Sequence, residues 1–136
     1  MKISSSKLLN DVQQHFHTKI GDFYFFEKYA VVEYAENVVV SMPTISNMIS
    51  RSKAFYGTEK QFGLIVNKVN NYSTIPSDAM KLESELKNLV CTAVVSYNLP
   101  SVVNFDLENH FFNAINRKLF SSIEEAEKWV LSMLIE

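Results

Sequence analysis

The densest group of polar side chains in the sequence lies in residues 67–77, where amides, a phenol and hydroxyls follow one another closely. The group consists of Asn67, Asn70, Asn71, Tyr72, Ser73, Thr74 and Ser77. It follows an apolar run and ends beside Pro76, where a helix is expected to begin. In open α/β sheets ligands bind beyond the carboxyl ends of the strands, and free N–H groups at a helix start favour anions. These residues therefore form our candidate ligand- or partner-binding loop.

A structural role explains the same residues more simply. Asn and Ser are common in turns because their side chains bond to the nearby backbone. A Ser or Asp close to Pro76, such as Ser77, would also suit the cap of the following helix. A functional role for these residues remains an alternative to this structural role, because a phosphate on Ser73 or Ser77 would be stabilised near a helix N-terminus.

The rest of the chain shows no pattern of a catalytic, metal or cofactor site. His15 and His17 share one face if they lie on a strand, but a metal site needs a third ligand, and neither HExxH nor HxxEH follows. Cys91 is the single cysteine and begins an apolar run, which favours an inert core residue. Neither GxGxxG nor GxxxxGK[ST] occurs. We therefore expect no catalytic residue, no metal, no cofactor and no enzymatic activity.

Composition narrows the class of protein further. A chain of 136 residues with a net charge of -2 suits one domain, 1–136, and it lacks the basic stripe of a nucleic-acid binder. The first residues have no apolar core long enough for a signal peptide, and no stretch reaches the roughly 20 apolar residues of a spanning helix. These observations predict a cytoplasmic protein without a transmembrane segment.

The expected elements alternate along the chain. Aromatic and β-branched residues up to position 40 predict strands, with turns near Gly21 and in "YAEN", while the first ten residues are expected to be frayed or a short helix. Helices are then predicted at 44–55, from Pro76, at 101–115 and from Ser122, which with Glu125 forms a capping box. Apolar strands fall between them. This order predicts an α/β domain with a mixed sheet, an N-terminal antiparallel hairpin and about four helices.

Four segments carry a resemblance to a known family. They are "YAVVEYAENVVVSM", "GLIVNKVNNYS", "CTAVVSYN" and the closing "LFSSIEEAEKWVLSML". In this order and spacing they resemble the SpoIIAA-like group of the STAS superfamily, in particular its uncharacterised bacterial STAS/SEC14-like branch. The resemblance implies a mixed sheet backed by helices over positions 23–134.

The resemblance also implies a regulatory role. Family members act as anti-sigma-factor antagonists, switched by phosphorylation of a serine in an Asp-Ser-Ser-Gly-like motif between a strand and a helix. The corresponding connection here offers Ser73, Thr74 and Ser77 but lacks that motif, so the phosphorylated position is not carried over to any of them.

Aromatic residues suggest how the domain could act. Strand alternation places Phe23 and Phe25 on one side and Tyr24 and Phe26 on the other, so either both faces of the sheet are covered or one is an apolar patch. We expect a non-catalytic protein-interaction domain, with a possible homodimer, whose unknown protein partner contacts helix 44–55 and the 67–77 loop. The alternative is a carrier of a small apolar ligand or lipid.

Overall fold

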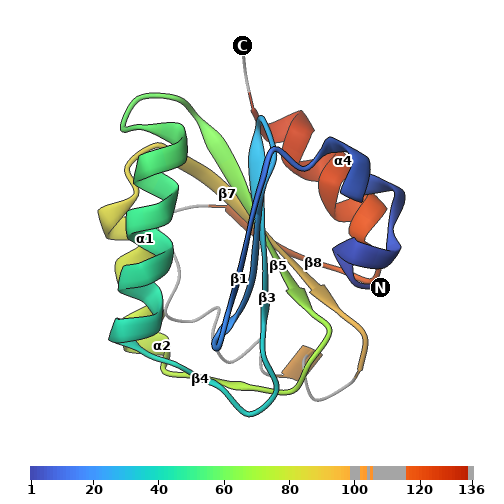
Figure 1. Cartoon of the computed structure of the whole chain (residues 1–136), viewed down its shortest axis with the longest axis vertical. Helices are drawn as coiled ribbons and strands as arrows, with labels where there is room; N and C mark the ends of the chain where they lie inside the picture. The colour runs from blue at the N-terminus through green and yellow to red at the C-terminus, as the bar shows by residue number, and fades with distance from the viewer. Residues whose placement is uncertain (99–101, 104, 106–115, 135–136) are drawn as a thin grey trace.

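The computed structural model describes residues 1–98, 102–103, 105 and 116–134, and its centre is a six-stranded mixed β-sheet (Figure 1). The strand order is β1-β2-β3-β5-β7-β8. The strands are β1 (Gln14–Thr18), β2 (Gly21–Phe25), β3 (Tyr29–Tyr34), β5 (Phe62–Lys68), β7 (Leu89–Ser96) and β8 (Asn116–Phe120). The predicted α/β class and mixed sheet are thus confirmed.

The antiparallel part is built from the first three strands. β1 pairs with β2 and β2 with β3, both antiparallel, as the predicted N-terminal hairpin requires. Gly21 has φ +142, and a Cβ there would lie 2.4 Å from the carbonyl oxygen of Glu33, so the position needs glycine. The β1–β2 turn lies close to this glycine, where the sequence placed it.

β5, β7 and β8 run parallel to β3. α1 (Met42–Tyr56) leads into β5 and α2 (Pro76–Glu85) leads into β7, whereas α4 (Ile123–Met133) follows β8. α1 begins with Pro43 in its first turn and ends at Gly57, which has φ +73. The Ser122 side chain accepts a hydrogen bond from the Glu125 N–H at 3.2 Å, which is one half of the expected capping box.

Both faces of the sheet are covered. α1 and α2 lie on one face, and α4 lies on the other together with two short 3-10 helices, Ile3–Ser5 and Lys7–Asp11 (Figure 1). Phe23 and Phe25 pack beneath α1 and α2, while Tyr24 and Phe26 pack on the α4 side. The alternation of these side chains was therefore predicted correctly, and of the two alternatives the structure supports the one in which both faces of the sheet are covered.

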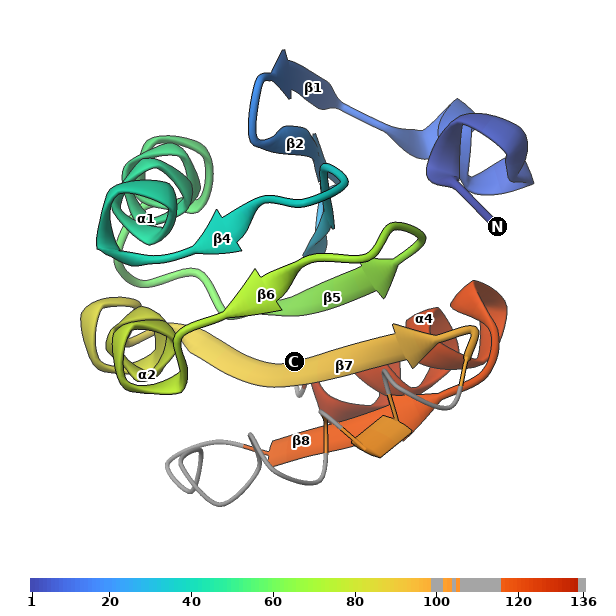
Figure 2. The same ribbon diagram turned by 90° about the horizontal axis from the view of Figure 1, so that it is seen from below.

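The segment after β3 departs from the predicted strand pair. Positions 38–40 do not form a hairpin with β3; instead β4 (Val39–Val40) pairs parallel with β6 (Ser73–Thr74). This two-stranded ribbon crosses below the carboxyl ends of the main strands, at the entrances to α1 and α2 (Figure 2). The candidate loop is thus partly a strand.

Helix capping also differs from expectation. The residue that caps α2 is Ile75, which makes no side-chain capping bond. Asp78 instead accepts a hydrogen bond at 3.1 Å from the Met42 N–H and so caps α1. A carboxylate in the first turn of one helix reaches the neighbouring helix because both begin at the same ribbon.

Two further expectations concern the N-terminal segment and the helix predicted at 101–115. The first residues form the short 3-10 helices and bury Ile3 and Leu8, so the segment is packed rather than frayed. The helix predicted at 101–115 falls outside the described residues except at 102, 103 and 105.

In the described part of the chain, no helix is both long and apolar enough to cross a membrane.

Candidate functional site

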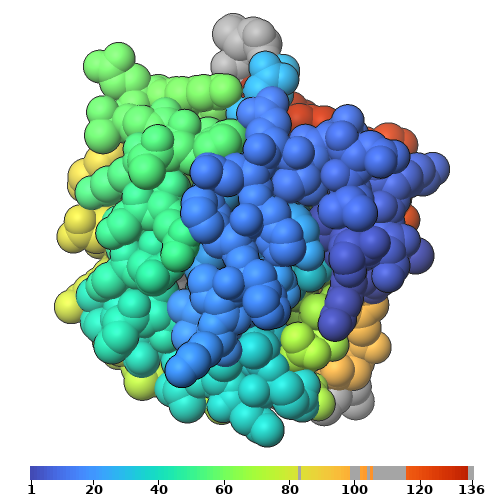
Figure 3. Space-filling view, viewed as in Figure 1, coloured from blue at the N-terminus to red at the C-terminus, as the bar shows by residue number. Residues whose placement is uncertain are grey.

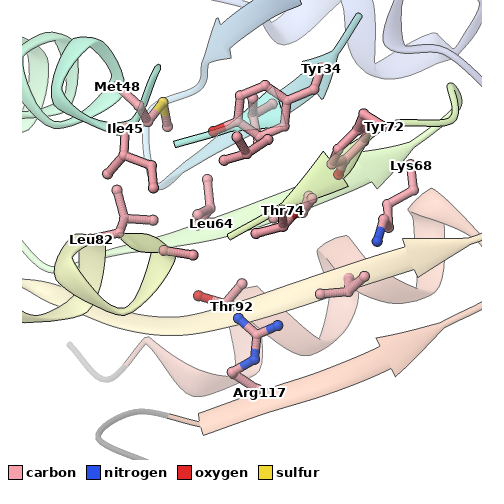
Figure 4. Close-up of a pocket in the computed structure, with 15 residues that line it drawn as sticks. Tyr34, Ile45, Met48, Leu64, Lys68, Tyr72, Thr74, Leu82, Thr92 and Arg117 are labelled. Atoms are coloured by element: carbon pink, nitrogen blue, oxygen red, sulfur yellow. The ribbon is translucent and has the colours of Figure 1, made fainter. Parts of the chain in front are cut away.

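A partly enclosed pocket lies between α1, α2 and the sheet (Figure 4). Its floor consists of Val32 of β3, Leu64 and Val66 of β5, and Thr92 and Val94 of β7. The helices supply Ile45, Met48, Ala79 and Leu82, and the β4–β6 ribbon supplies Val40 and Thr74. Because strand positions two apart face the same side, these apolar residues form one continuous surface.

A cation stands at each end of this apolar floor. Arg117 of β8 is in register with Thr92, and Lys68 of β5 is in register with Ser96. Four residues of strand separate the two pairs, or about 13 Å along β7 at roughly 3.3 Å per residue. Figure 4 shows Arg117 reaching up from β8 toward Thr92 and Lys68 at the side where the strands end.

Aromatic rings hold the two cations in place. The Lys68 ammonium lies 5.2 Å from the centre of the Tyr72 ring, and the Arg117 guanidinium lies 5.6 Å from the centre of the Phe105 ring. Tyr72 packs in turn on Tyr34, with ring centres 5.2 Å apart. Cation–ring contacts of this kind stabilise a positive charge beside apolar surface. The pocket thus combines apolar walls with fixed positive charge.

The size of the pocket limits what it can receive. A water molecule has access to a volume of about 60 Å³. Since a cavity needs roughly 10–15 Å³ of such space to hold one water, this pocket has room for a few waters or one small side chain. A long-chain lipid requires α1 and α2 to move apart.

The residues of the candidate loop separate into three environments. Tyr72 and Thr74 line the pocket. Ser73 and Ser77 are exposed. Asn67, Asn70 and Asn71 make hydrogen bonds within the fold: the Asn70 side chain donates to the Tyr34 carbonyl, and the Asn71 N–H donates to Glu36.

Asn67 belongs to a second polar cluster, on the other face of the sheet. Its side-chain N–H donates to the Glu33 carboxylate at 2.6 Å, and its oxygen accepts from the Tyr97 hydroxyl at 2.7 Å. Burial raises the pKa of Glu33, although hydrogen bonds from the Ile3 N–H and from Asn67 oppose the rise. Burial and the charge of Glu33 raise the pKa of Tyr97 to about 12.

The two strand histidines have a partner that the sequence did not reveal. His15 Nε2 and His17 Nδ1 each lie 2.8 Å from the same oxygen of Asp22 on β2. Partial burial raises the pKa of Asp22, but the bonds and charges of the histidines outweigh it and leave the pKa lowered. Across the described residues, no set of three or more His, Cys, Asp or Glu side chains could hold a metal ion.

Cys91 is buried on the α4 side of the sheet, where burial raises the pKa of its thiol to about 11. A thiol in this environment is largely protonated at neutral pH and is a poor nucleophile.

Sequence reasoning missed three charged residues, Lys68, Glu33 and Arg117. Lys68 and Glu33 sit in strands whose other residues are largely apolar, which indicates that both are buried beside the core. Arg117 lies in a strand that is as polar as it is apolar, and it carried no such signal. The same alternation separates Asn67 from the loop, because it places Lys68 on the pocket side and Asn67 on the opposite face.

Comparison of the chain with protein-family models, with curated proteins and with solved structures finds no match.

Proposed function

We propose that the protein is a non-catalytic regulatory domain of the SpoIIAA-like (STAS) type and that it binds a protein partner through the pocket between α1, α2 and the sheet. The observation that carries the proposal is an apolar pocket of side-chain size with a cation at each end. A partner segment that fits it presents one apolar side chain next to an acidic group.

The location of the pocket supports a partner-binding role. The pocket joins α1 to the 67–77 segment through Met48, Tyr72 and Thr74, the two regions in which the sequence predicts a partner. Beside it, Val39 of β4 and Ile75, the residue that follows β6, are exposed, and they alternate in sequence with the pocket-lining Val40 and Thr74. An apolar contact could therefore continue from the pocket onto the surface.

Energetics favour a single anchoring side chain. Complete burial of a Leu- or Phe-sized group contributes about 1.5–3 kcal/mol, and such anchors in well-packed pockets dominate many interfaces. Fixed positive charge adds selectivity for acidic partners and accelerates their association.

The STAS assignment rests on the order of elements. Three strands followed by alternating helices and parallel strands support it, as does the capped helix at the end of the chain. The phosphorylated serine of that family remains unassigned, because Ser73 and Ser77 are exposed but lie outside an Asp-Ser-Ser-Gly motif.

Affinity capture from the source cells, with quantitative mass spectrometry, tests this function. Arg117→Gln removes one pocket cation, and Lys118→Gln is its matched control because Lys118 is the exposed neighbour on the same strand. Ala79→Leu fills the pocket, with exposed Met80→Leu as its control. We expect a partner lost with Arg117→Gln and Ala79→Leu and retained with both controls. Equal capture by all four variants would reject the pocket as the binding site.

A small apolar ligand is the second candidate, favoured by the enclosed apolar walls of the same pocket. Native mass spectrometry of the purified protein distinguishes it: a retained small molecule, displaced in Ala79→Leu, would support a carrier or sensor. A bare protein mass, together with a captured partner, would support protein binding.

A further inference from the structure

The polar cluster on the α4 side of the sheet lies where open α/β sheets bind their ligands. Glu33 is near the end of β3, Asn67 is near the end of β5, and Tyr97 directly follows β7. These strands are parallel neighbours, so their carboxyl ends bring the three side chains to one edge. The cluster lies on the opposite face from the pocket and is independent of the function proposed for that pocket.

The partner of this cluster is the main chain of the N-terminal segment, residues 1–12. The Ile3 N–H donates to Glu33 Oε2 at 2.8 Å. The Met1 carbonyl accepts from the Asn67 side chain at 2.9 Å and lies 3.3 Å from the Tyr97 hydroxyl, which donates its single hydrogen mainly to the Asn67 oxygen at 2.7 Å. Glu33 and Asn67, the latter oriented by Tyr97, therefore bind one N–H and one C=O two residues apart, groups that every peptide presents.

A purely structural cover of the sheet would not require this chemistry. Glu33 is 3% exposed and Asn67 is fully buried, and a buried carboxylate destabilises a fold unless its hydrogen bonds compensate. Apolar residues would cover the same edge without that cost. Polar groups fix the register of the main chain that they bind, as a recognition site must.

The N-terminal segment is held by few groups. Ile3 and Leu8 are buried, whereas the other residues of the segment are exposed or half-buried. Its two 3-10 helices span three and five residues, and short helices of this kind have little stability of their own. Figure 3 shows the dark-blue segment lying on the surface beside the β1–β2 hairpin. Such segments open at lower free energy than core strands.

We propose that Glu33, Asn67 and Tyr97 form a binding site for a peptide main chain, which the N-terminal segment occupies in this structure and from which a partner peptide displaces it. The preferred peptide places an apolar side chain where Ile3 lies. Bound in cis, the segment competes with the partner, because only molecules with an open site bind a second peptide.

The test uses the full-length protein and a fluorescent peptide of residues 1–12, MKISSSKLLNDV, with binding measured by anisotropy. Ile3→Ala in the protein weakens the segment in cis, and Leu9→Ala is the control because Leu9 is an exposed apolar residue of the same segment. We expect the peptide to bind the Ile3→Ala protein at least tenfold more tightly than the wild type, and to bind Leu9→Ala like the wild type. Adding Tyr97→Phe to Ile3→Ala should weaken binding several-fold, because the hydroxyl that orients the Asn67 amide, which binds the Met1 carbonyl, is lost.

Peptide variants and hydrogen exchange complete the test. A peptide carrying Ile3→Ala should lose binding, and one carrying Leu9→Ala should keep it. In the wild-type protein the amides of residues 3–12 should exchange faster than those of β5. The proposal is overturned if the folded Ile3→Ala protein does not bind the peptide, or if the segment exchanges only with global unfolding.

Discussion

Gly63 of β5 lies directly beneath α4, and substituting it tests the packing of that helix. A Cβ at position 63 would lie 2.3 Å from Val130 Cγ1 and 3.3 Å from Cys91 Sγ. Carbon atoms in contact are about 3.5–4.0 Å apart, so Gly63→Ala forces α4 or the Val130 side chain to move. Overpacking of a core typically costs about 1–3 kcal/mol, and we expect Gly63→Ala to lower the free energy of unfolding by that amount.

Val130→Ala should relieve this clash. Alone it removes two buried methyl groups, at about 0.8 kcal/mol each, and leaves a cavity, so it should cost about 2 kcal/mol. In the double variant the new Cβ faces Val130 Cβ at 3.6 Å, an ordinary contact. The two substitutions should therefore couple favourably by at least about 1 kcal/mol. Urea unfolding followed by circular dichroism measures this cycle, and strictly additive or larger losses would refute the packing described.

Three further predictions concern single groups. The pKa of Glu33 is higher in the folded state than its ordinary value of 4.5. Ionisation of Glu33 therefore lowers the stability of the fold as the pH rises from 4.5 through the pKa of the folded state. Thermal unfolding should show wild type losing stability relative to Glu33→Gln over that range, and a pH-independent difference would contradict the assignment. Cys91, whose thiol has a pKa of about 11, should react with a thiol reagent at pH 8 only when the protein unfolds. At that pH only about 0.1% of the thiol is ionised, and burial further shields it from the reagent. Rapid labelling of the native protein would contradict this burial. Asp78→Ala should lower the free energy of unfolding by about 1 kcal/mol, because the Met42 N–H at the start of α1 loses its acceptor, and Asp78→Asn should have a smaller effect. Chemical unfolding measures both, and equal stability of the wild type and the two variants would contradict the capping role.

Local patterns predicted most of the central sheet and its helices. Apolar runs identified β5 and β7, and Pro43 with Gly57 marked the ends of α1, because burial and backbone geometry at those positions depend on neighbouring residues. Period-two alternation placed Phe23 and Tyr24 on opposite faces for the same reason.

Long-range pairings were not accessible in this way. The β4–β6 ribbon joins two-residue strands 34 positions apart, Val39 with Ser73, which leave no periodic signal. Asp78 caps a helix that begins 36 residues earlier, and Asp22 bonds His15 across a strand pair, so each depends on the assembled fold. Of the candidate loop residues, Tyr72 and Thr74 line the pocket because they follow β5 at the carboxyl edge of the sheet, and binding by this loop stays a prediction.

Site-specific photocrosslinking in the source cells tests the central claim, that the pocket binds a protein partner. A small diazirine side chain would replace Leu82, which lines the pocket, or Leu131, a 41% exposed apolar residue of α4. We predict a crosslinked polypeptide from position 82 whose yield falls with Arg117→Gln but not with Lys118→Gln, and none from position 131. Equal crosslinking from both positions, or no polypeptide from position 82, would contradict the claim.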